Sequence, residues 1–262
     1  MSPPLAVVTG GSTGIGRQLV SALAGAGHAV AFSYRSSQVA ADSLCGELAA
    51  GGARVLAVEC DVGIKSDVEA FYARVTDWHG TAPCLLVNNA GVQTWSPLLD
   101  LAEERWDEVI RTNLKGCFLN TQIAARLMKQ AGQRGAIVNI GSGCNKLAFP
   151  NLVDYTASKG GIEQFTKSAA AELGPFGITV NCVAPGAIAT ERTNAETTDY
   201  AASWSEITPL RRIGTPEDVA GVVLFFASPA AAFVTGQTLW VDGGVFSCAS
   251  WPRPRGTGYG EG

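Results

Sequence analysis

The chain has 262 residues, of which 47% are hydrophobic and 16% charged, and this balance excludes a disordered polar chain. Its net charge of −4 provides no basic surface for nucleic acid or for an anionic membrane. No apolar run reaches the roughly 18 residues of a membrane span, and residues 1–4 lack the features of a signal peptide.

Two distant histidines argue against a metal site built on imidazole, so we predict no metal. Seven scattered cysteines without a Cys-x-x-Cys pair favour the reducing cytosol, and we expect a cytoplasmic protein.

Short apolar runs alternate with amphipathic stretches along the chain. The runs are rich in Val, Ile and Leu, which is typical of parallel strands covered on both faces, and they predict strands over 5–9, 29–33, 54–59, 84–88, 136–140, 178–183 and 238–241. Helical patterns cover 15–26, 38–50, 65–78, 103–130, 155–173 and 216–227. This alternation predicts an α/β fold, a Rossmann-type doubly wound sheet of seven mainly parallel strands with helices on both faces.

No linker divides the pattern, so we predict a single domain over residues 1–250. Residues 190–212 are polar and only weakly periodic, and an insertion of this length in a compact α/β domain is typically a lid over a site. Residues 251–262 contain Pro252, Pro254 and several glycines, and we expect an irregular C-terminal tail there.

Residues 9–16 read Thr-Gly-Gly-Ser-Thr-Gly-Ile-Gly and connect the first predicted strand to the first helix. Gly10, Gly14 and Gly16 permit a sharp turn, a close approach to a pyrophosphate and tight packing of the helix on the sheet. The helix start then presents N–H groups and partial positive charge to phosphates. The loop, with Ser12 and Ile15, therefore predicts a dinucleotide site.

The end of the second strand distinguishes NAD from NADP. NAD enzymes usually place an Asp or Glu there for the ribose 2′-hydroxyl, whereas this chain has Tyr34, Arg35 and Ser36, and its next acid is Asp42. A guanidinium beside hydroxyl groups neutralises and binds a 2′-phosphate. We predict that NADP(H) is preferred, with NAD(H) as the alternative. A solvated arginine on a loop is the purely structural interpretation.

Two more strand ends carry residues suited to the nucleotide. Asp61 and Val62 follow the third strand, where a carboxylate can accept a hydrogen bond from an adenine amino group. Residues 88–91, Asn-Asn-Ala-Gly, follow the fourth strand, where the strand order reverses and ligands bind. A helix cap for Asp61 and loop-tying hydrogen bonds for the asparagines are the structural alternatives.

Residues 155–159 read Tyr-Thr-Ala-Ser-Lys at a predicted helix start. Hydride reduction of a ketone needs a proton donor at the oxygen, and a phenol, with an ordinary pKa of about 10, serves when a cation is close. Residues four apart share a helix face, so Lys159 can favour the phenolate of Tyr155 and also donate to the nicotinamide ribose.

Two further residues complete the predicted reaction site. Ser142 follows the fifth strand and can place its hydroxyl against the substrate oxygen. Asn113 is a polar residue in an otherwise apolar helical stretch. It either makes a kink or a core hydrogen bond, or connects Lys159 to a water molecule.

In order and spacing these motifs resemble those of the short-chain dehydrogenase/reductase family over residues 7–244. The resemblance includes the glycine loop, Asn-Asn-Ala-Gly and the Asn, Ser, Tyr and Lys positions. It also includes a Pro185-Gly186 turn followed by Ile188 and Thr190, a structural Asn181, and a final strand within 235–244.

The resemblance implies an NAD(P)-dependent oxidoreductase acting on CH–OH or C=O groups. Tyr155 would donate the proton, Ser142 orient the carbonyl, Lys159 act on Tyr155 and the ribose, and Asn113 support a relay water. The residues expected to contact the cofactor are Gly10, Ser12, Gly14, Ile15, Gly16, Tyr34, Arg35, Ser36, Asp61, Val62, Asn89, Ala90, Gly91, Tyr155, Lys159, Pro185, Gly186, Ile188 and Thr190.

The resemblance also implies a homotetramer, or a dimer, assembled through the helical stretches 103–130 and 155–173. Their apolar side chains suit either such an interface or packing on the sheet, namely Leu114, Phe118, Ile123, Leu127, Ile162 and Phe165.

The substrate pocket is expected to lie beside residues 186–189 and the lid. Its predicted lining is mostly apolar and consists of Ser142, Cys144, Leu147, Phe149, Leu152 and Trp204. This favours a small, neutral, partly hydrophobic ketone. Arg192, Arg211 and Arg212 keep an acidic substrate or a carrier-protein thioester open.

The leading prediction is an NADPH-dependent carbonyl reductase. The alternatives are a sugar or alcohol dehydrogenase working oxidatively, since residues 148–155 and 185–190 are similar to bacterial glucose dehydrogenases, and a 3-oxoacyl thioester reductase. From a different class, an inactive nucleotide-sensing module would not need all four reaction-site residues. A methyltransferase would need neither the Tyr–Lys pair nor Arg35.

Overall fold

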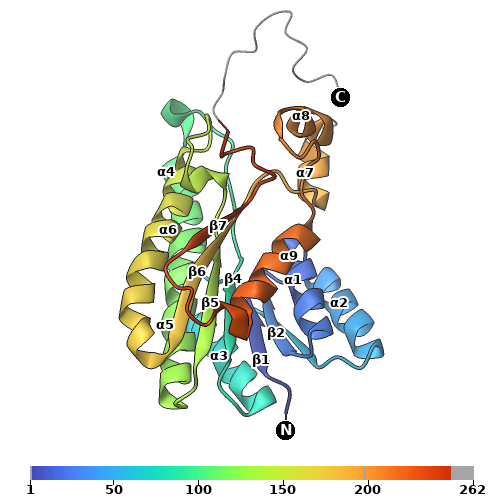
Figure 1. Cartoon of the computed structure of the whole chain (residues 1–262), viewed down its shortest axis with the longest axis vertical. Helices are drawn as coiled ribbons and strands as arrows, with labels where there is room; N and C mark the ends of the chain where they lie inside the picture. The colour runs from blue at the N-terminus through green and yellow to red at the C-terminus, as the bar shows by residue number, and fades with distance from the viewer. Residues whose placement is uncertain (1, 197–198, 249–262) are drawn as a thin grey trace, which may run out of the picture.

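The computed structural model describes residues 2–196 and 199–248. Seven strands form one sheet in the order β3-β2-β1-β4-β5-β6-β7 (Figure 1), and every neighbouring pair is parallel. The strands are β1 (Leu5–Val8), β2 (Ala29–Tyr34), β3 (Val55–Glu59), β4 (Leu85–Asn88), β5 (Gly135–Ile140), β6 (Ile178–Pro185) and β7 (Thr238–Val241). The predicted Rossmann-type sheet is confirmed.

The helices connect successive strands and cover both faces of the sheet. They are α1 (Gly14–Gly25), α2 (Gln38–Ala50), α3 (Lys65–His79), α4 (Glu103–Val109), α5 (Gly116–Gln130), α6 (Val153–Leu173), α7 (Glu191–Glu196), α8 (Tyr200–Ile207) and α9 (Pro216–Ala227). Short turns of helix occur at η1 (Leu98–Asp100), η2 (Ile110–Lys115), η3 (Gly143–Asn145), η4 (Gly174–Phe176) and η5 (Pro229–Ala231).

Two segments differ from the predicted elements. The stretch 103–130 is divided by η2, which is a π-helical turn, and the expected irregular lid at 190–212 contains the short helices α7 and α8. The expected C-terminal tail, residues 251–262, lies outside the described residues.

One apolar core lies on each face of the sheet. Helices α1, α2 and α9 pack on one face and α3, α5 and α6 on the other (Figure 1). Strand β1, between β2 and β4, is fully buried because both of its faces are covered. This explains why its sequence shows no polar alternation.

Most of the apolar side chains considered for an interface pack inside the chain instead. Ile162 is buried, and Leu114, Ile123 and Leu127 pack against the cores. Phe118 on α5 is 42% exposed.

Within the described residues, no helix combines the length and the apolar character that a bilayer crossing requires. In the same part of the chain, no group of three or more His, Cys, Asp or Glu side chains is arranged to hold a metal ion.

A buried polar network connects the central strands to α6. The Asn88 amide donates to Asn139 Oδ1 (2.8 Å) and to Thr121 Oγ1 (3.0 Å). The Asn139 amide donates to Thr166 Oγ1 on α6 (2.9 Å). Buried polar groups of this kind favour one arrangement of the elements that carry them, because a buried donor or acceptor without a partner costs free energy. The network therefore fixes how α6 sits against β4 and β5.

We predict that Asn139→Ala lowers the free energy of unfolding by about 1–3 kcal/mol, because the two buried bonds with Asn88 and Thr166 and a third from the Cys117 thiol are lost. Urea denaturation measures the change. The control is Gln130→Ala at the exposed end of α5, where a shift within about 0.5 kcal/mol is expected. Equal stabilities of the two variants would contradict the role of the network.

Candidate active site

A cavity of about 670 Å³ lies at the carboxyl ends of the strands. Loops that follow β1 to β6 line it, since parallel strands all end at the same edge of the sheet. Every residue predicted above to contact the cofactor lines this cavity, and Ser142 lines it as well.

The glycine loop has no space for a side chain at Gly10 or Gly16. Gly10 has a φ of +64°, and a Cβ on it would lie 2.9 Å from the Cα of Ala90. A Cβ on Gly16 would lie 2.0 Å from the carbonyl oxygen of Gly10. Helix α1 thus begins directly at the cavity, where the N–H groups of a first helical turn can bind phosphate oxygens.

Thr9 and Asn89 hold the glycine loop against the loop after β4. Thr9 Oγ1 accepts hydrogen bonds from the backbone N–H groups of Asn89 and Ala90, each at 3.0 Å. The Asn89 amide donates to the carbonyls of Thr9 and Gly10, also at 3.0 Å. The loop-tying role considered for the asparagines is therefore present in the structure.

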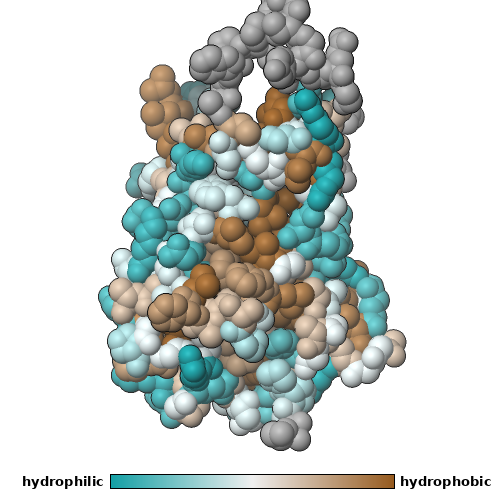
Figure 2. All heavy atoms as spheres, in the orientation of Figure 1, coloured by the Kyte–Doolittle hydropathy of each residue, from teal (hydrophilic) through white to brown (hydrophobic). Residues whose placement is uncertain are grey.

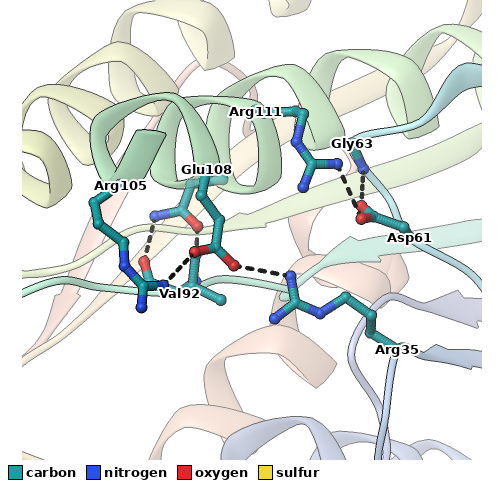
Figure 3. A network of polar contacts seen from close by, with 8 residues as sticks. Arg35, Asp61, Gly63, Val92, Arg105, Glu108 and Arg111 are labelled. Carbon is teal, nitrogen blue, oxygen red and sulfur yellow. Dashed lines mark hydrogen bonds and ion pairs between the residues drawn. The ribbon is translucent and has the colours of Figure 1, made fainter. Parts of the chain in front are cut away.

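Asp61 lies between two donors at the end of β3. One carboxylate oxygen accepts from the N–H of Gly63, and the other pairs with Arg111 at 2.9 Å (Figure 3). Partial burial alone would raise the pKa of Asp61, but the bonds from Arg111 and Gly63 outweigh it, so the pKa lies below its usual range. Asp61 is therefore an anion at neutral pH.

Arg35 lines the cavity and forms an ion pair with Glu108 of α4 at 3.2 Å (Figure 3). Glu108 also pairs with Arg105 at 2.9 Å. Sequence reasoning did not identify Arg111 or Glu108, because Asp61 and Arg35, their partners at the cavity, are distant from them in the chain.

Tyr155 and Lys159 lie one turn apart at the start of α6. Lys159 is 3% exposed, and its Nζ donates to the carbonyl of Ile140 at 2.8 Å. This ammonium lies 5.4 Å from the centre of the Tyr155 ring. Burial of a charge is costly unless a partner compensates for it. The hydrogen bond to the carbonyl of Ile140 stabilises the Lys159 ammonium, and a phenolate on Tyr155 would stabilise it further.

Asn113 lies in the π-helical turn η2 and connects the loop after β4 to helix α6. Its Oδ1 accepts from the N–H of Val92 (2.8 Å), and its amide donates to the carbonyl of Val92 (2.9 Å) and to Ser158 Oγ (3.0 Å). Ser158 in turn donates to the carbonyl of Tyr155 at 2.8 Å. The core hydrogen bonds considered for Asn113 are present, and they lie in a π-helical turn. Its support of a relay water stays a prediction.

Ser142 starts the turn η3, where its Oγ accepts from the N–H of Cys144 at 3.3 Å and its own N–H donates to Asn145. Because this turn fixes the backbone, the hydroxyl has a defined position at the wall of the cavity that Tyr155 also lines.

The other predicted substrate residues lie outside the cavity lining. Cys144 and Leu152 are each 6% exposed, and Leu147 is 44% exposed. Phe149 and Trp204 form an aromatic cluster with Phe246, with ring centres 5.7–6.5 Å apart. Phe246 was missed, since nothing in the sequence after β7 indicates that it returns to this region. The substrate pocket therefore stays a prediction.

The three arginines considered for an acidic substrate differ in position. Arg192 lines the cavity and donates to Gln93 Oε1 at 3.4 Å. Arg212 pairs with Asp218 (2.6 and 2.9 Å), and Arg211 donates to the carbonyl of Glu206.

Known proteins resemble the chain over nearly its whole length. The family model described as enoyl-(acyl carrier protein) reductase matches residues 10–246. A 3-oxoacyl-(acyl-carrier-protein) reductase of Staphylococcus epidermidis is 39% identical over 242 residues, which is 92% of this chain and 98% of that protein. One from Synechocystis is 40% identical over 249 residues, covering 94% and 98%.

Solved structures show the same similarity. An acetoin dehydrogenase from Enterobacter cloacae is 34% identical, with a TM-score of 0.87 and coverage of 97% of this chain and 99% of that one. A gluconate 5-dehydrogenase from Burkholderia cenocepacia, in complex with NADP and tartrate, is 34% identical with a TM-score of 0.87, covering 95% and 97%.

We predict that Gly16→Ala weakens binding of a nicotinamide dinucleotide by more than about tenfold, because the methyl group would displace the carbonyl of Gly10. Fluorescence titration measures the affinity. The matched control is Gly25→Ala at the end of the same helix, where a Cβ meets nothing within 4 Å. Similar affinities of both variants would refute a phosphate-binding role for this turn.

Proposed function

Because the chain belongs to the short-chain dehydrogenase/reductase family, we propose that it is an NADPH-dependent carbonyl reductase acting on a small, neutral, partly hydrophobic ketone. As a member of this family it is an NAD(P)-dependent oxidoreductase of CH–OH and C=O groups. The observation that carries the proposal is that Tyr155, Lys159 and Ser142 line the same cavity as the glycine loop and Arg35.

The residues of the cavity fit a dinucleotide. The tight glycine loop and the start of α1 would hold the pyrophosphate, and Asp61 with Val62 would hold the adenine. Lys159 would bind the nicotinamide ribose, and Ile188 with Thr190 would lie at the nicotinamide. When bound, the reduced nicotinamide supplies the hydride.

NADPH is preferred in this proposal because of the charge at the end of β2. Arg35, Ser36 and Ser37 line the cavity there, and a guanidinium with two hydroxyls suits a dianionic phosphate. The NADP in the gluconate 5-dehydrogenase structure agrees with this choice.

In the proposed mechanism Tyr155 donates its phenolic proton to the carbonyl oxygen as that oxygen becomes negative. The Ser142 hydroxyl donates to the same oxygen and orients it. The buried ammonium of Lys159 stabilises the phenolate that remains. Asn113 acts through Ser158, which bonds to the carbonyl of Tyr155, and so keeps the first turn of α6 in place.

We predict that Tyr155→Phe lowers kcat by more than about 100-fold, because the proton donor is removed, while NADPH affinity changes less than about twofold. Absorbance at the reduced-nicotinamide band measures turnover with a panel of ketones, and fluorescence titration measures binding. A variant that retains a large part of the wild-type rate would remove Tyr155 from this role.

A second candidate substrate is a 3-oxoacyl thioester. The 39–40% identical relatives named as 3-oxoacyl-(acyl-carrier-protein) reductases favour it, and Arg192 at the cavity supplies a cation for an acidic carrier or substrate. Oxidation of a sugar acid or alcohol is the third candidate, since 34% identical structures are named as gluconate and acetoin dehydrogenases.

The predicted substrate pocket keeps its place in the proposal, with Trp204 and Phe149 as its aromatic wall. We expect Trp204→Ala to change the ratio of kcat/KM between a bulky and a small ketone by about tenfold or more, with KM for NADPH changed less than about twofold. Ile207→Ala, an exposed position at the end of the same helix, is the control. An unchanged ratio would exclude Trp204 from the pocket.

We also propose one domain over residues 1–250, with 190–212 as the lid, since Glu191 and Arg192 line the cavity. A homotetramer, or a dimer, and a cytosolic location belong to the proposal. Figure 2 shows apolar side chains along the middle of the face where Figure 1 draws β7 and α9. Exposed Phe225, Phe233 and Leu239, together with Phe118, support self-association.

A further inference from the structure

We propose that Glu108 is a specificity-determining residue for the cofactor, because its carboxylate competes with a 2′-phosphate for Arg35. This inference rests on the proposed function. Its starting observation is the 3.2 Å ion pair between Arg35 Nη1 and Glu108 Oε1, which joins the loop after β2 to helix α4 (Figure 3).

Arg35 is the cationic side chain in the part of the cavity that follows β2, where the ribose 2′ position of a dinucleotide is expected. Its side chain is 47% exposed and that of Glu108 is 28% exposed. The Glu108 carboxylate already accepts a hydrogen bond from one N–H group of Arg35. A phosphate that binds Arg35 must therefore share the guanidinium with this carboxylate or displace it. The two anions also repel each other at this range.

Arg105 is a second partner of Glu108, so Glu108 stays paired when Arg35 leaves it. Glu108 accepts a hydrogen bond from Arg105 at 2.9 Å on its other oxygen. Partial burial alone would raise the pKa of Glu108, but the bonds from Arg105 and Arg35 outweigh it, and the pKa lies below its usual range. Glu108 thus stays charged and retains a partner when Arg35 turns to a phosphate.

The same carboxylate does not oppose a cofactor that lacks the 2′-phosphate. NAD enzymes usually place an acid at the end of β2, and here Glu108, from a helix 73 residues further along the chain, brings an acid to Arg35 instead. Glu108 therefore weakens the binding of NADPH and does not weaken that of NADH. The chain then discriminates less between the two cofactors than it would if Arg35 had no acidic partner.

The test is Glu108→Gln, which keeps the size of the side chain and removes its charge. We expect NADPH to bind about threefold to tenfold more tightly and NADH to gain less than about twofold. Fluorescence titration with NADPH and with NADH measures this without a ketone, at low ionic strength, where charge effects are largest. Glu104→Gln, an exposed acid on the same helix, is the matched control and should change neither affinity.

The route through Arg35 is tested in the double variant Arg35→Ala/Glu108→Gln. We expect the gain in NADPH affinity from Glu108→Gln to fall below about twofold in the Arg35→Ala background. An unchanged or weaker NADPH affinity of Glu108→Gln, or an equal gain for NADH, would overturn the inference. Wild-type protein that binds neither dinucleotide would instead overturn the proposed function, and the inference with it.

Discussion

Seven strands that run in one direction all end at the same edge of the sheet, and most groups that line the candidate site lie at or directly after one of those ends. The glycine loop, Arg35, Asp61, Asn89, Ser142 and Pro185 come from six different strands. They lie close together because the carboxyl ends of parallel strands all lie at the same edge of the sheet. The crossover helices cover both faces, so this edge is where a ligand can reach backbone groups and side chains together.

The reaction end is fixed by buried polar contacts rather than by apolar packing. Lys159, Asn113 and Ser158 are each at most 3% exposed. Hydrogen bonds connect them to the loop after β4, to the end of β5 and to the first turn of α6. An unpaired polar group in such surroundings costs about 1–3 kcal/mol, so these partners favour one position for Tyr155. The π-helical turn at Asn113 is part of the same arrangement, since turns of this kind are frequent at functional sites.

The other end of the cavity, where the proposal places the adenosine, is less buried and carries several charged side chains. Arg35, Arg105 and Arg111 face Asp61 and Glu108 there, a set with one more cation than anion. These pairs are partly exposed, so salt screens them and a ligand can exchange with them. One end of the cavity is thus held by buried hydrogen bonds, while the other is lined by partly exposed ion pairs that a charged ligand can replace.

The amino-acid sequence by itself determined the seven strands, the crossover helices and the residues around the glycine loop and the Tyr–Lys pair, because each depends on periodicity or spacing within a short stretch. Only the tertiary structure decided which side chains pair across that frame. Glu108 with Arg35, Arg111 with Asp61, and Phe246 with Phe149 are distant in the chain. The division of 103–130 by η2 also depends on the fold, since Asn113 bonds to Val92 and Ser158 on other elements. Such contacts arise from packing between elements, and no local pattern of residues specifies them.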